Sequence, residues 1–253
     1  MISIKSEREI EIMREAAQKL RNVFFELKDL IRPGTTGIQI DEKAEKVIRA
    51  QNAKPAFKGY RGYPGTVCIS INEQVVHGIP SSQRINEGDI VSLDMGLIWK
   101  DFYSDAARTW PVGKASESAA KLIRVTKESL FKGLDQMKVG NRIGDISAAV
   151  QQHIESNGFS VVRDFVGHGI GRALHEDPQV PNFGTKGKGQ KLEAGMVLAI
   201  EPMVNMGTCE VEILKDEWTV VTKDRKWSAH YEDTICLRAE GPENLTADPL
   251  GKI

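Results

Sequence analysis

The segment EGDIVSLDMG, residues 87–96, is echoed by EAGMVLAIEPM at residues 193–203. In both segments a Gly-led turn is followed by an apolar run that is short enough for a buried strand. A single carboxylate interrupts each run at the same place, Asp94 in the first and Glu201 in the second. The echo predicts two similar strands that each present an acidic side chain at an equivalent point.

A second pair of similar segments precedes these strands. RPGTTGIQIDEKAEKVIRAQN at 32–52 resembles KVGNRIGDISAAVQQHIESNG at 138–158, and a helical pattern comes before each of them. Because the order of elements repeats as well as the letters, we interpret the chain as one domain, 1–253, with two similar halves at about 1–112 and 113–253. The expected fold class is α/β in the α+β sense, with helices and antiparallel strands in each half around a pseudo-twofold axis.

Local signals predict the individual elements. Ser6 with Glu9 forms a capping box before apolar residues at helical spacing, and Thr36 with Gln39 forms another. Further helices are expected at 116–137 and 144–157. Strands are expected at 66–71, 90–98, 102–112, 161–166, 196–204, 210–214, 217–222 and 228–237, with a polar loop at 181–190.

Composition narrows the class of protein but not its activity. The chain has 253 residues, of which 40% are hydrophobic and 27% charged, and its net charge is −1. Dispersed Lys and Arg residues give no basic footprint for nucleic acid, and no apolar run is long enough for a membrane span. The charged start is unlike a signal peptide, and three scattered cysteines form no CxxC pair. We therefore expect a cytoplasmic protein, with a monomer as the default.

The carboxylates within the apolar strands predict a bound cation. An ionised carboxylate in such a place is destabilising unless an opposite charge compensates it, and no Lys or Arg alternates with Asp94 or Glu201. If Trp99 and Lys100 form the tip of a hairpin, Asp94 lies directly opposite Asp105. Two carboxylates that close together repel each other unless they share a proton or a metal ion.

His168 and Glu232 complete the candidate ligand set. His168 lies in FVGHGIGRALHEDP between glycines, which allow other groups to approach closely, whereas Glu232 taken alone would be an exposed strand carboxylate. Four carboxylates and one imidazole form an oxygen-rich site that suits Mn or Fe(II) and also accepts Co or Zn. Bridging carboxylates fit two divalent ions at ~3.5–4 Å from each other.

These residues resemble the metal motif of the pita-bread metallopeptidases, and the chain is similar to the type I methionine aminopeptidases over nearly its whole length. The resembling segments are KPAFKGYRGYPGTVCISINEQVVHGIP, EGDIVSLDMG, YSDAARTWPVG, GHGIGRALHEDP, GMVLAIEPM and SAHYEDTI. The resemblance implies a pita-bread fold in which Asp94 chelates one metal ion, while His168 and Glu201 bind the other. It also implies that Asp105 and Glu232 bridge the two ions.

The resemblance further implies a reaction, the hydrolytic removal of the first methionine from nascent polypeptides with a preference for a small second residue. Glu201 would be the general base, and His77 and His175 would contact the substrate amide and stabilise the tetrahedral intermediate. The pocket for the methionine side chain would be lined by Tyr60, Tyr63, Cys68 and Trp218. A monovalent cation would bind largely to carbonyl groups near Asn72, Gln74 and Ser228. Work on nascent chains implies a place near the ribosomal exit tunnel.

Two positions depart from the pattern of that family. Leu174 stands where an aromatic side chain is common, so one wall of the pocket is expected to differ. Asp233 stands where a histidine often follows the last ligand, which would add negative charge near the site. No zinc-finger extension or N-terminal domain is expected before the first helix. The short spacing between Glu201 and Glu232 leaves no room for the helical insertion of type II enzymes.

Three other functions stay open on the residues alone. A proline-specific peptidase of the same fold would share the metal ions but would need a different pocket. A non-catalytic binding protein of the same fold would have lost metal ligands, whereas all five are present here. A dinuclear phosphoesterase would add Arg or Lys near the metal ions, and Arg108 and Arg172 lie close to the motifs in sequence.

Overall fold

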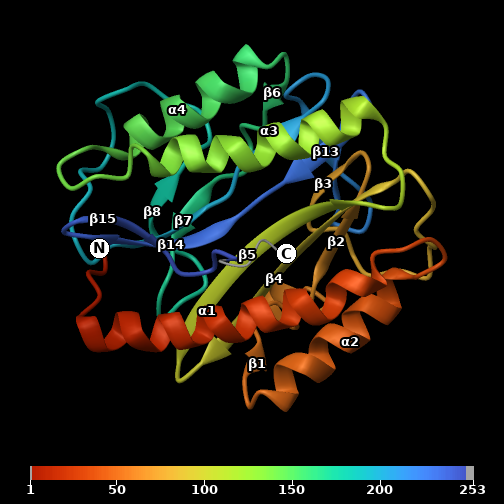
Figure 1. The fold of residues 1–253 in the computed structure, drawn as a ribbon, viewed down its shortest axis with the longest axis horizontal. Helices are drawn as coiled ribbons and strands as arrows, with labels where there is room; N and C mark the ends of the chain where they lie inside the picture. The colour runs from red at the N-terminus through yellow and green to blue at the C-terminus, as the bar shows by residue number, and fades with distance from the viewer. Residues whose placement is uncertain (1, 249–253) are drawn as a thin grey trace.

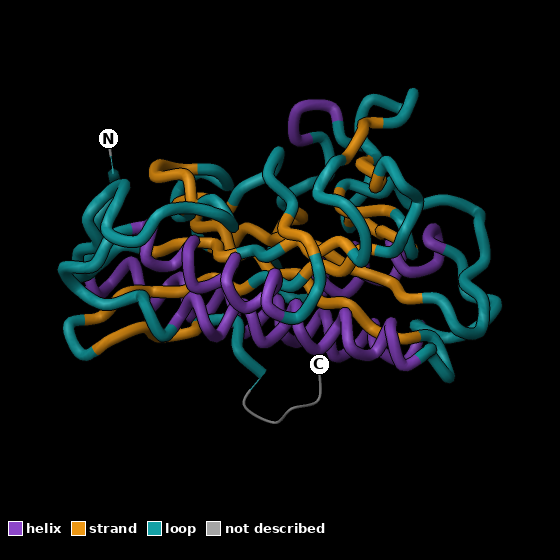
Figure 2. The backbone as a smooth tube through the Cα atoms, turned by 90° about the horizontal axis from the view of Figure 1, so that it is seen from above, coloured by secondary structure: helices purple, strands orange, loops and turns teal. Residues whose placement is uncertain are grey.

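The computed structural model describes residues 2–248. Its helices form two pairs, α1 (Glu7–Leu27) with α2 (Gly37–Ala50) and α3 (Glu117–Leu134) with α4 (Ile143–Ser156), placed at opposite ends of the view in Figure 1. Seen from above, the helices lie on one side of the strands and most of the loops lie on the other (Figure 2). The predicted domain, 1–253, extends at both ends beyond the described residues.

Local sequence explains where the helices begin. The Ser6 N–H donates to the Glu9 carboxylate at 3.0 Å, and the Gln39 N–H donates to the Thr36 hydroxyl at 3.3 Å. Both predicted capping boxes are therefore confirmed. A 3₁₀ turn, η1 (Lys28–Leu30), follows α1. The two helices predicted in the C-terminal half are confirmed as α3 and α4, with small differences at their ends.

Antiparallel strands form four sheets within the described residues. The sheet of the N-terminal half consists of β1 (Lys54–Pro55), β2 (Cys68–Ile71), β4 (Ile90–Trp99) and β5 (Phe102–Pro111). The largest sheet of the C-terminal half has the order β15 (Gly241–Asn244), β14 (Asp233–Arg238), β9 (Val197–Ile200), β7 (Gly167–Gly169) and β8 (Glu176–Val180). Two small sheets consist of β13 (Ser228–His230), β10 (Met203–Asn205) and β6 (Ser160–Val161), and of β11 (Val211–Ile213), β12 (Val220–Thr222) and β3 (Gln74–Val76). A 3₁₀ turn, η2 (Tyr60–Gly62), lies between β1 and β2.

The hairpin of β4 and β5 has a different register from the predicted one. Its two-residue tip comes one residue later, at Lys100 and Asp101, whose φ angles of 48° and 65° suit the mirror-image turns of tight hairpins. Asp94 therefore pairs with Ala107, and the prediction that it lies directly opposite Asp105 is wrong. Because the register shifts by two residues, both carboxylates remain on one face as diagonal neighbours.

Several predicted strands are broken or short. The run that contains Glu201 is divided into β9 and β10, because Pro202 has no N–H to donate to a ladder. The run that contains Glu232 is divided into β13 and β14 next to that residue. Of the strand predicted at 161–166, only Val161 is confirmed, at the end of β6. Glu201 and Glu232 therefore both lie at strand breaks.

One buried cluster joins each helix pair to strands of its own half. Phe24 of α1 and Leu93 of β4 belong to one buried cluster. Leu130 of α3 and Leu198 of β9 belong to another. The order of helices and strands is therefore similar in the two halves, as the echoed segments predict.

Besides the pairing of β3 with β12, the two halves join along an antiparallel seam between β5 and the segment that leads into β14. Ala107 and Glu232 exchange two backbone hydrogen bonds of 3.2 and 2.9 Å. Beside them, the Thr234 hydroxyl donates to the Asp105 carbonyl at 2.8 Å and accepts from the Asp105 N–H at 3.1 Å. A side-chain hydroxyl therefore replaces a backbone partner, and the seam holds Asp105 beside Glu232.

A second hydroxyl extends the seam on its other side. The Thr109 hydroxyl donates to the His230 carbonyl at 2.7 Å and accepts from the His230 N–H at 3.0 Å. Thr109 belongs to β5, whereas Thr234 belongs to β14. Each half therefore contributes one threonine that binds the backbone of the other half.

Candidate metal centre

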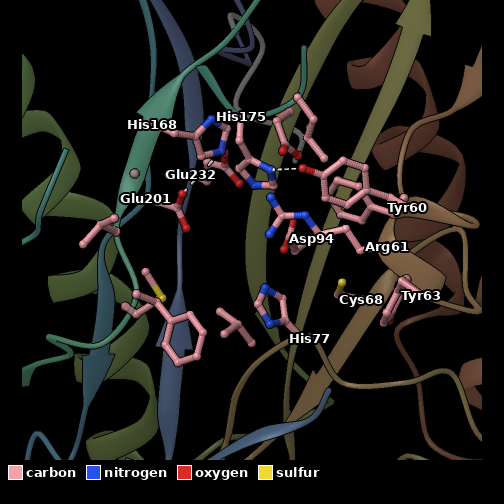
Figure 3. A pocket seen from close by; sticks show the side chains of 18 of the residues that line it. Tyr60, Arg61, Tyr63, Cys68, His77, Asp94, His168, His175, Glu201 and Glu232 are labelled. Atoms are coloured by element: carbon pink, nitrogen blue, oxygen red, sulfur yellow. Dashed lines mark hydrogen bonds and ion pairs between the residues drawn. The ribbon is translucent and has the colours of Figure 1, made fainter. Parts of the chain in front are cut away.

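One pocket of about 640 Å³ brings together all eleven side chains expected at the catalytic, metal and methionine sites. They are Tyr60, Tyr63, Cys68, His77, Asp94, Asp105, His168, His175, Glu201, Trp218 and Glu232. Figure 3 labels all of them except Asp105 and Trp218. The pocket takes residues from both halves of the chain, so it exists only when the halves are joined. The residues expected to hold a monovalent cation do not line it.

The candidate ligands come from both halves. Asp94 and Asp105 project from β4 and β5, whereas Glu201 and Glu232 lie at the strand breaks of the C-terminal half. His168 lies on β7, which pairs with β9, the strand that ends directly before Glu201. Ligand atoms of Asp105, His168 and Glu232 lie within 4.8 Å of one another, and Nε2 of His168 is 3.6 Å from Oε1 of Glu201.

Unpaired oxygens in this cluster fit a cation. Asp94, Asp105 and Glu232 are buried, and each has a carboxylate oxygen without a hydrogen-bond partner among the described residues. A buried ionised carboxylate is strongly destabilising unless a charge or a metal ion compensates it. Oxygen-rich ligand sets are those that hard divalent ions prefer. The donor set therefore fits divalent metal ions of the kind predicted.

Burial and mutual repulsion change the proton affinities of the same groups. Burial, followed by repulsion from Asp105, raises the pKa of Asp94 well above its ordinary value. Burial raises the pKa of Asp105 to about 7, and it is also the main cause of the raised pKa values of Glu201 and Glu232. Burial lowers the pKa of His168 to about 3, which keeps the imidazole neutral, as metal ligation requires.

A chain of contacts orients the imidazoles of the pocket. His168 Nδ1 lies 2.9 Å from the carbonyl oxygen of Gly169, which leaves Nε2 toward the carboxylates. The His175 ring lies edge-on to His168 with centroids 4.3 Å apart, and its Nδ1 is 2.7 Å from the Tyr60 hydroxyl. Burial, followed by the charge of Arg61, lowers the pKa of His175. The free Nε2 of His175 is thereby left for a ligand in the pocket.

His77 enters the pocket from the residue that follows β3. Its φ of 59° is unusual for a non-glycine residue and turns the chain sharply at this point. The ring lies edge-on to Phe165 and Trp218, with centroid distances of 5.5 and 6.3 Å. Burial, followed by the charge of His175, lowers the pKa of His77 to about 4, so a neutral imidazole faces the pocket near pH 7.

An apolar wall lies beside the ligand cluster. The Tyr63 hydroxyl lies 3.1 and 2.9 Å from the carbonyl oxygens of Val67 and Gly78, so its polar end is satisfied away from the pocket. Its ring packs edge-on to Trp218 with centroids 5.1 Å apart. Cys68 on β2 is also buried in this wall. These groups provide an apolar surface with a polarisable sulfur.

Apart from Leu174, the other side chains that line the pocket had no distinct signal in the sequence. Phe165 and Met203 extend the apolar wall, and Leu174 takes part in it, so the departure at that position does lie at the pocket. Phe165 is close to His168 in sequence, which was the only hint available. Arg61 also lines the pocket, and no pattern pointed to it.

His230 is a second residue that the sequence did not mark. It is 1% exposed, and neither of its ring nitrogens has a hydrogen-bond partner among the described residues. Its Nε2 lies 3.8 Å from Oε2 of Glu201, and burial lowers the pKa of His230 to about 3. The sequence could have indicated His230 only through its position, two residues before Glu232 in an apolar strand. A neutral imidazole therefore lies next to the ligand cluster.

A buried ion pair accounts for Asp233. Its carboxylate accepts from Arg108 Nη2 at 2.6 Å and from the Thr246 hydroxyl at 2.6 Å. Arg108 also donates to the carbonyl of Glu232 at 2.5 Å. Asp233 and Arg108 do not line the pocket, so the negative charge expected near the site is compensated by Arg108. The pair holds the backbone of Glu232 from behind.

The three residues of the expected monovalent site lie close together outside the pocket. The Ser228 N–H donates to the Asn72 carbonyl at 2.8 Å. The Asn72 side chain donates to Asp89 at 2.9 Å, and the Gln74 side chain accepts from the Ile71 N–H at 2.9 Å. Because the two amide side chains are engaged in local turns, a cation here would depend on backbone carbonyl groups.

The two-halved fold and its buried oxygen-rich cluster define a metallopeptidase. The model of metallopeptidase family M24 matches residues 11–239, and the chain belongs to this family. Over 246 residues the chain is 56% identical to a methionine aminopeptidase from Clostridium perfringens, with 97% of this chain and 99% of that protein covered.

Solved structures agree with this assignment. The methionine aminopeptidase from Thermotoga maritima superposes with a TM-score of 0.96 at 46% identity, covering 98% of this chain and all of that one. An Xaa-Pro dipeptidase from Bacillus anthracis gives a TM-score of 0.80 at 27% identity, and only 62% of its chain is covered. The predicted pita-bread fold is confirmed.

Proposed function

We propose that this chain is a methionine aminopeptidase, which hydrolyses the peptide bond that follows an N-terminal methionine. One observation carries the proposal: the carboxylate cluster and the apolar wall that contains Tyr63, Cys68 and Trp218 share a single pocket. The cluster suits divalent ions, and an apolar wall with a polarisable sulfur suits a thioether side chain. Similarity to methionine aminopeptidases over nearly the full chain supports the same reaction.

The five candidate ligands would hold two divalent ions, drawn from Mn, Fe(II), Co and Zn. Asp94 would chelate one ion, and His168 and Glu201 would bind the other. Asp105 and Glu232 would lie between the two ions, a role that the seam between the halves supports by holding them side by side. When bound, such ions polarise a carbonyl group and lower the pKa of a water molecule.

Side chains around the ligands would position the substrate and move its protons. Glu201 would act as general base toward the attacking water and later return the proton. His175, held at Nδ1 by Tyr60, would direct Nε2 at the substrate carbonyl and stabilise negative charge there. His77, wedged between two aromatic rings, would contact the amide. The enclosed apolar wall would exclude bulk water from the reacting bond.

The pocket also suggests how the substrate is oriented. A neutral α-amine beside the carboxylate cluster would restrict the reaction to the N-terminus, and the methionine side chain would lie on the apolar wall. A shallow space for the second residue would favour small side chains. We propose nascent polypeptides as the substrates and a single chain, with halves at about 1–112 and 113–253, as the active unit. A monovalent cation near Asn72, Gln74 and Ser228 would support the backbone of the pocket.

The setting follows from the proposed substrate. Nascent chains emerge in the cytoplasm, so we propose a cytoplasmic enzyme that works close to the ribosomal exit tunnel. Among residues 2–248, no helix has the length and apolar character needed to cross a membrane.

The test is product analysis by mass spectrometry on peptides that start Met-Ala, Met-Leu, Leu-Ala and Ala-Pro, with Mn²⁺ and with a chelator. Release of methionine from the Met-Ala peptide alone, abolished by the chelator, is the expected result. Cleavage of Ala-Pro instead would identify a proline-specific peptidase of the same fold. Absence of cleavage despite metal binding would overturn the peptidase proposal.

The two arginines that raised the phosphoesterase alternative do not support it. Arg108 is buried against Asp233, and Arg172 is exposed and donates to Glu9 at 3.2 Å. Neither of these arginines lines the pocket, whereas phosphate transfer needs cationic groups near the reacting phosphate.

A further inference from the structure

The mouth of the pocket has one cationic side chain. Among the described residues that line the pocket, Arg61 is the only lysine or arginine, and it faces a lining that contains six carboxylates. Its side chain is exposed, and in the view of Figure 3 it projects from η2 toward the middle of the pocket, in front of the area between His175 and Asp94. Because the other charged lining groups are acidic, Arg61 is the one place where the opening attracts negative charge.

The backbone holds this side chain at the opening in spite of strain. Arg61 has a φ of 49°, in a turn where Gly59 and Gly62 have φ angles of 85° and 92°. Left-handed backbone is unfavourable for a residue with a Cβ atom, and such outliers cluster at functional sites. Hydrogen bonds from Gly59 to Tyr63 at 2.8 Å and from Tyr63 to Tyr60 at 2.9 Å close the turn. These bonds fix the backbone of the turn, and with it the point from which the Arg61 side chain extends.

Among the described residues, no ion pair joins the Arg61 guanidinium to the acidic residues around it. The Cζ atom of Arg61 lies 5.5 Å from the centroid of the Tyr60 ring, which is within the range of a cation–π contact. Tyr60 in turn contacts His175. On the same lining, the Glu176 carboxylate is already engaged by Lys5 at 2.7 Å. The five N–H donors of Arg61 are therefore available for an incoming ligand.

We propose that Arg61 determines specificity at the third residue of the peptide, where it favours an acidic side chain. This inference depends on the proposed function. The first residue would lie in the pocket and the second in the shallow space beside the cluster, so the third is the first that reaches the mouth. An aspartate or glutamate there would pair with the guanidinium, whereas a lysine would be repelled.

The experiment compares kcat/KM for three amidated peptides, Met-Ala-Glu-Ser, Met-Ala-Gln-Ser and Met-Ala-Lys-Ser. The metal-loaded protein is expected to favour the glutamate peptide over the glutamine peptide about threefold, the size typical of an exposed ion pair. The lysine peptide is expected to be the slowest. At ~1 M salt, where the Debye length is only ~3 Å, the differences should nearly vanish.

Variants at one position test the cause. Arg61→Asn removes the charge, and asparagine tolerates left-handed backbone, so the variant should fold normally. Its ratio of kcat/KM for the glutamate peptide to that for the glutamine peptide should be about one. Arg61→Lys should retain much of the preference, and Arg61→Glu should reverse it. Lys58→Gln is the matched control, because Lys58 lies in the same loop but pairs with Glu45 at 2.6 Å outside the pocket. This control should leave the ratio unchanged.

The outcomes separate the two proposals. Equal rates for the three peptides, or a preference that survives in a folded Arg61→Asn variant, would overturn the assignment of Arg61 and leave methionine removal intact. The same loss of preference in Lys58→Gln would also overturn it, because the effect would then be one of net charge. Failure to release methionine from all three peptides would overturn the proposed function and this inference with it.

Discussion

The two halves of the molecule hold their carboxylates in different ways. In the N-terminal half, Asp94 and Asp105 lie inside an unbroken hairpin whose ladder is continuous along both strands. In the C-terminal half, Glu201 and Glu232 lie where strands stop, between β9 and β10 and between β13 and β14. Backbone register therefore places the first two carboxylates, whereas the second two need additional contacts.

Side chains supply those contacts in the C-terminal half. The Asn182 amide donates to the Glu201 carbonyl at 2.9 Å, and Arg108 donates to the Glu232 carbonyl at 2.5 Å. The difference teaches that Asp94 is held by the ladder of its hairpin, whereas Glu201, at the equivalent position of the echoed segment, follows the end of a strand and is held by the Asn182 side chain. Substitutions of Asn182 and Arg108, which do not line the pocket, should therefore affect Glu201 and Glu232.

The largest effect is expected at the ligands themselves, and it should be equal in the two halves. Asp105→Asn and Glu232→Gln each replace a charged oxygen ligand with a neutral amide of the same shape. Each should lower kcat/KM by more than the ~10–100-fold that loss of an outer partner costs. Methionine release and calorimetric titration with Mn²⁺ check this, and a tolerated change in one half would show that its carboxylate is not a ligand.

The next largest effect should follow from breaking the buried pair behind Glu232. Arg108→Met leaves Asp233 buried without its partner, which should reduce the free energy of unfolding by about 3–5 kcal/mol. The double variant Arg108→Met with Asp233→Asn should recover part of this loss, because the unpaired charge is removed. Urea unfolding measures both variants. A double variant no more stable than Arg108→Met would show that the hydrogen bonds, not the charges, matter.

The metal-free protein should show a pH-dependent difference between wild type and Asp105→Asn. The pKa of Asp105 is about 7 in the fold and about 3.9 in an unfolded chain. The stability that Asp105 contributes to the wild-type protein is therefore present below pH ~4 and is lost as the pH rises toward 7. Between these values the variant should gain on the order of 2–4 kcal/mol relative to wild type, since each pKa unit is worth about 1.4 kcal/mol.

This comparison is insensitive to the buried histidines. Burial lowers the pKa of His168 and His77, so their contributions rise with pH and oppose that of Asp105, but they are common to both proteins. Urea unfolding at several pH values with a chelator measures the difference, and saturating Mn²⁺ should reverse its sign. A constant difference across the range would show that Asp105 is already ionised in the metal-free fold.

The smallest effects should come from the two threonines of the seam. Thr234→Val and Thr109→Val each remove a hydroxyl that both donates and accepts, so each should reduce stability by about 1–3 kcal/mol. Thr234→Val should also weaken Mn²⁺ binding more than Thr109→Val, because Thr234 binds the backbone of Asp105. Chemical unfolding and calorimetry measure the pair. Equal metal affinity in both variants would show that the seam does not position Asp105.

Much of the architecture could be predicted from local patterns. The capping residues Ser6 and Thr36 predicted the starts of two helices, because the N-terminal N–H groups of a helix need nearby acceptors. The carboxylates at Asp94 and Glu201 pointed to a common site, because charge inside an apolar strand needs compensation. These inferences depend on residues close in sequence or on the chemistry of a single side chain.

The sequence by itself determined the helices, the echoed halves and the residue types that meet in the pocket, because periodicity, capping and charge burial are local properties. Only the tertiary structure decided the register of the hairpin, the strand break at Glu232 and the pairing of Asp233 with Arg108. It also decided that Arg61 lies at the mouth and His230 beside Glu201. These features depend on which distant segments pack together, and no single stretch of the chain contains that information.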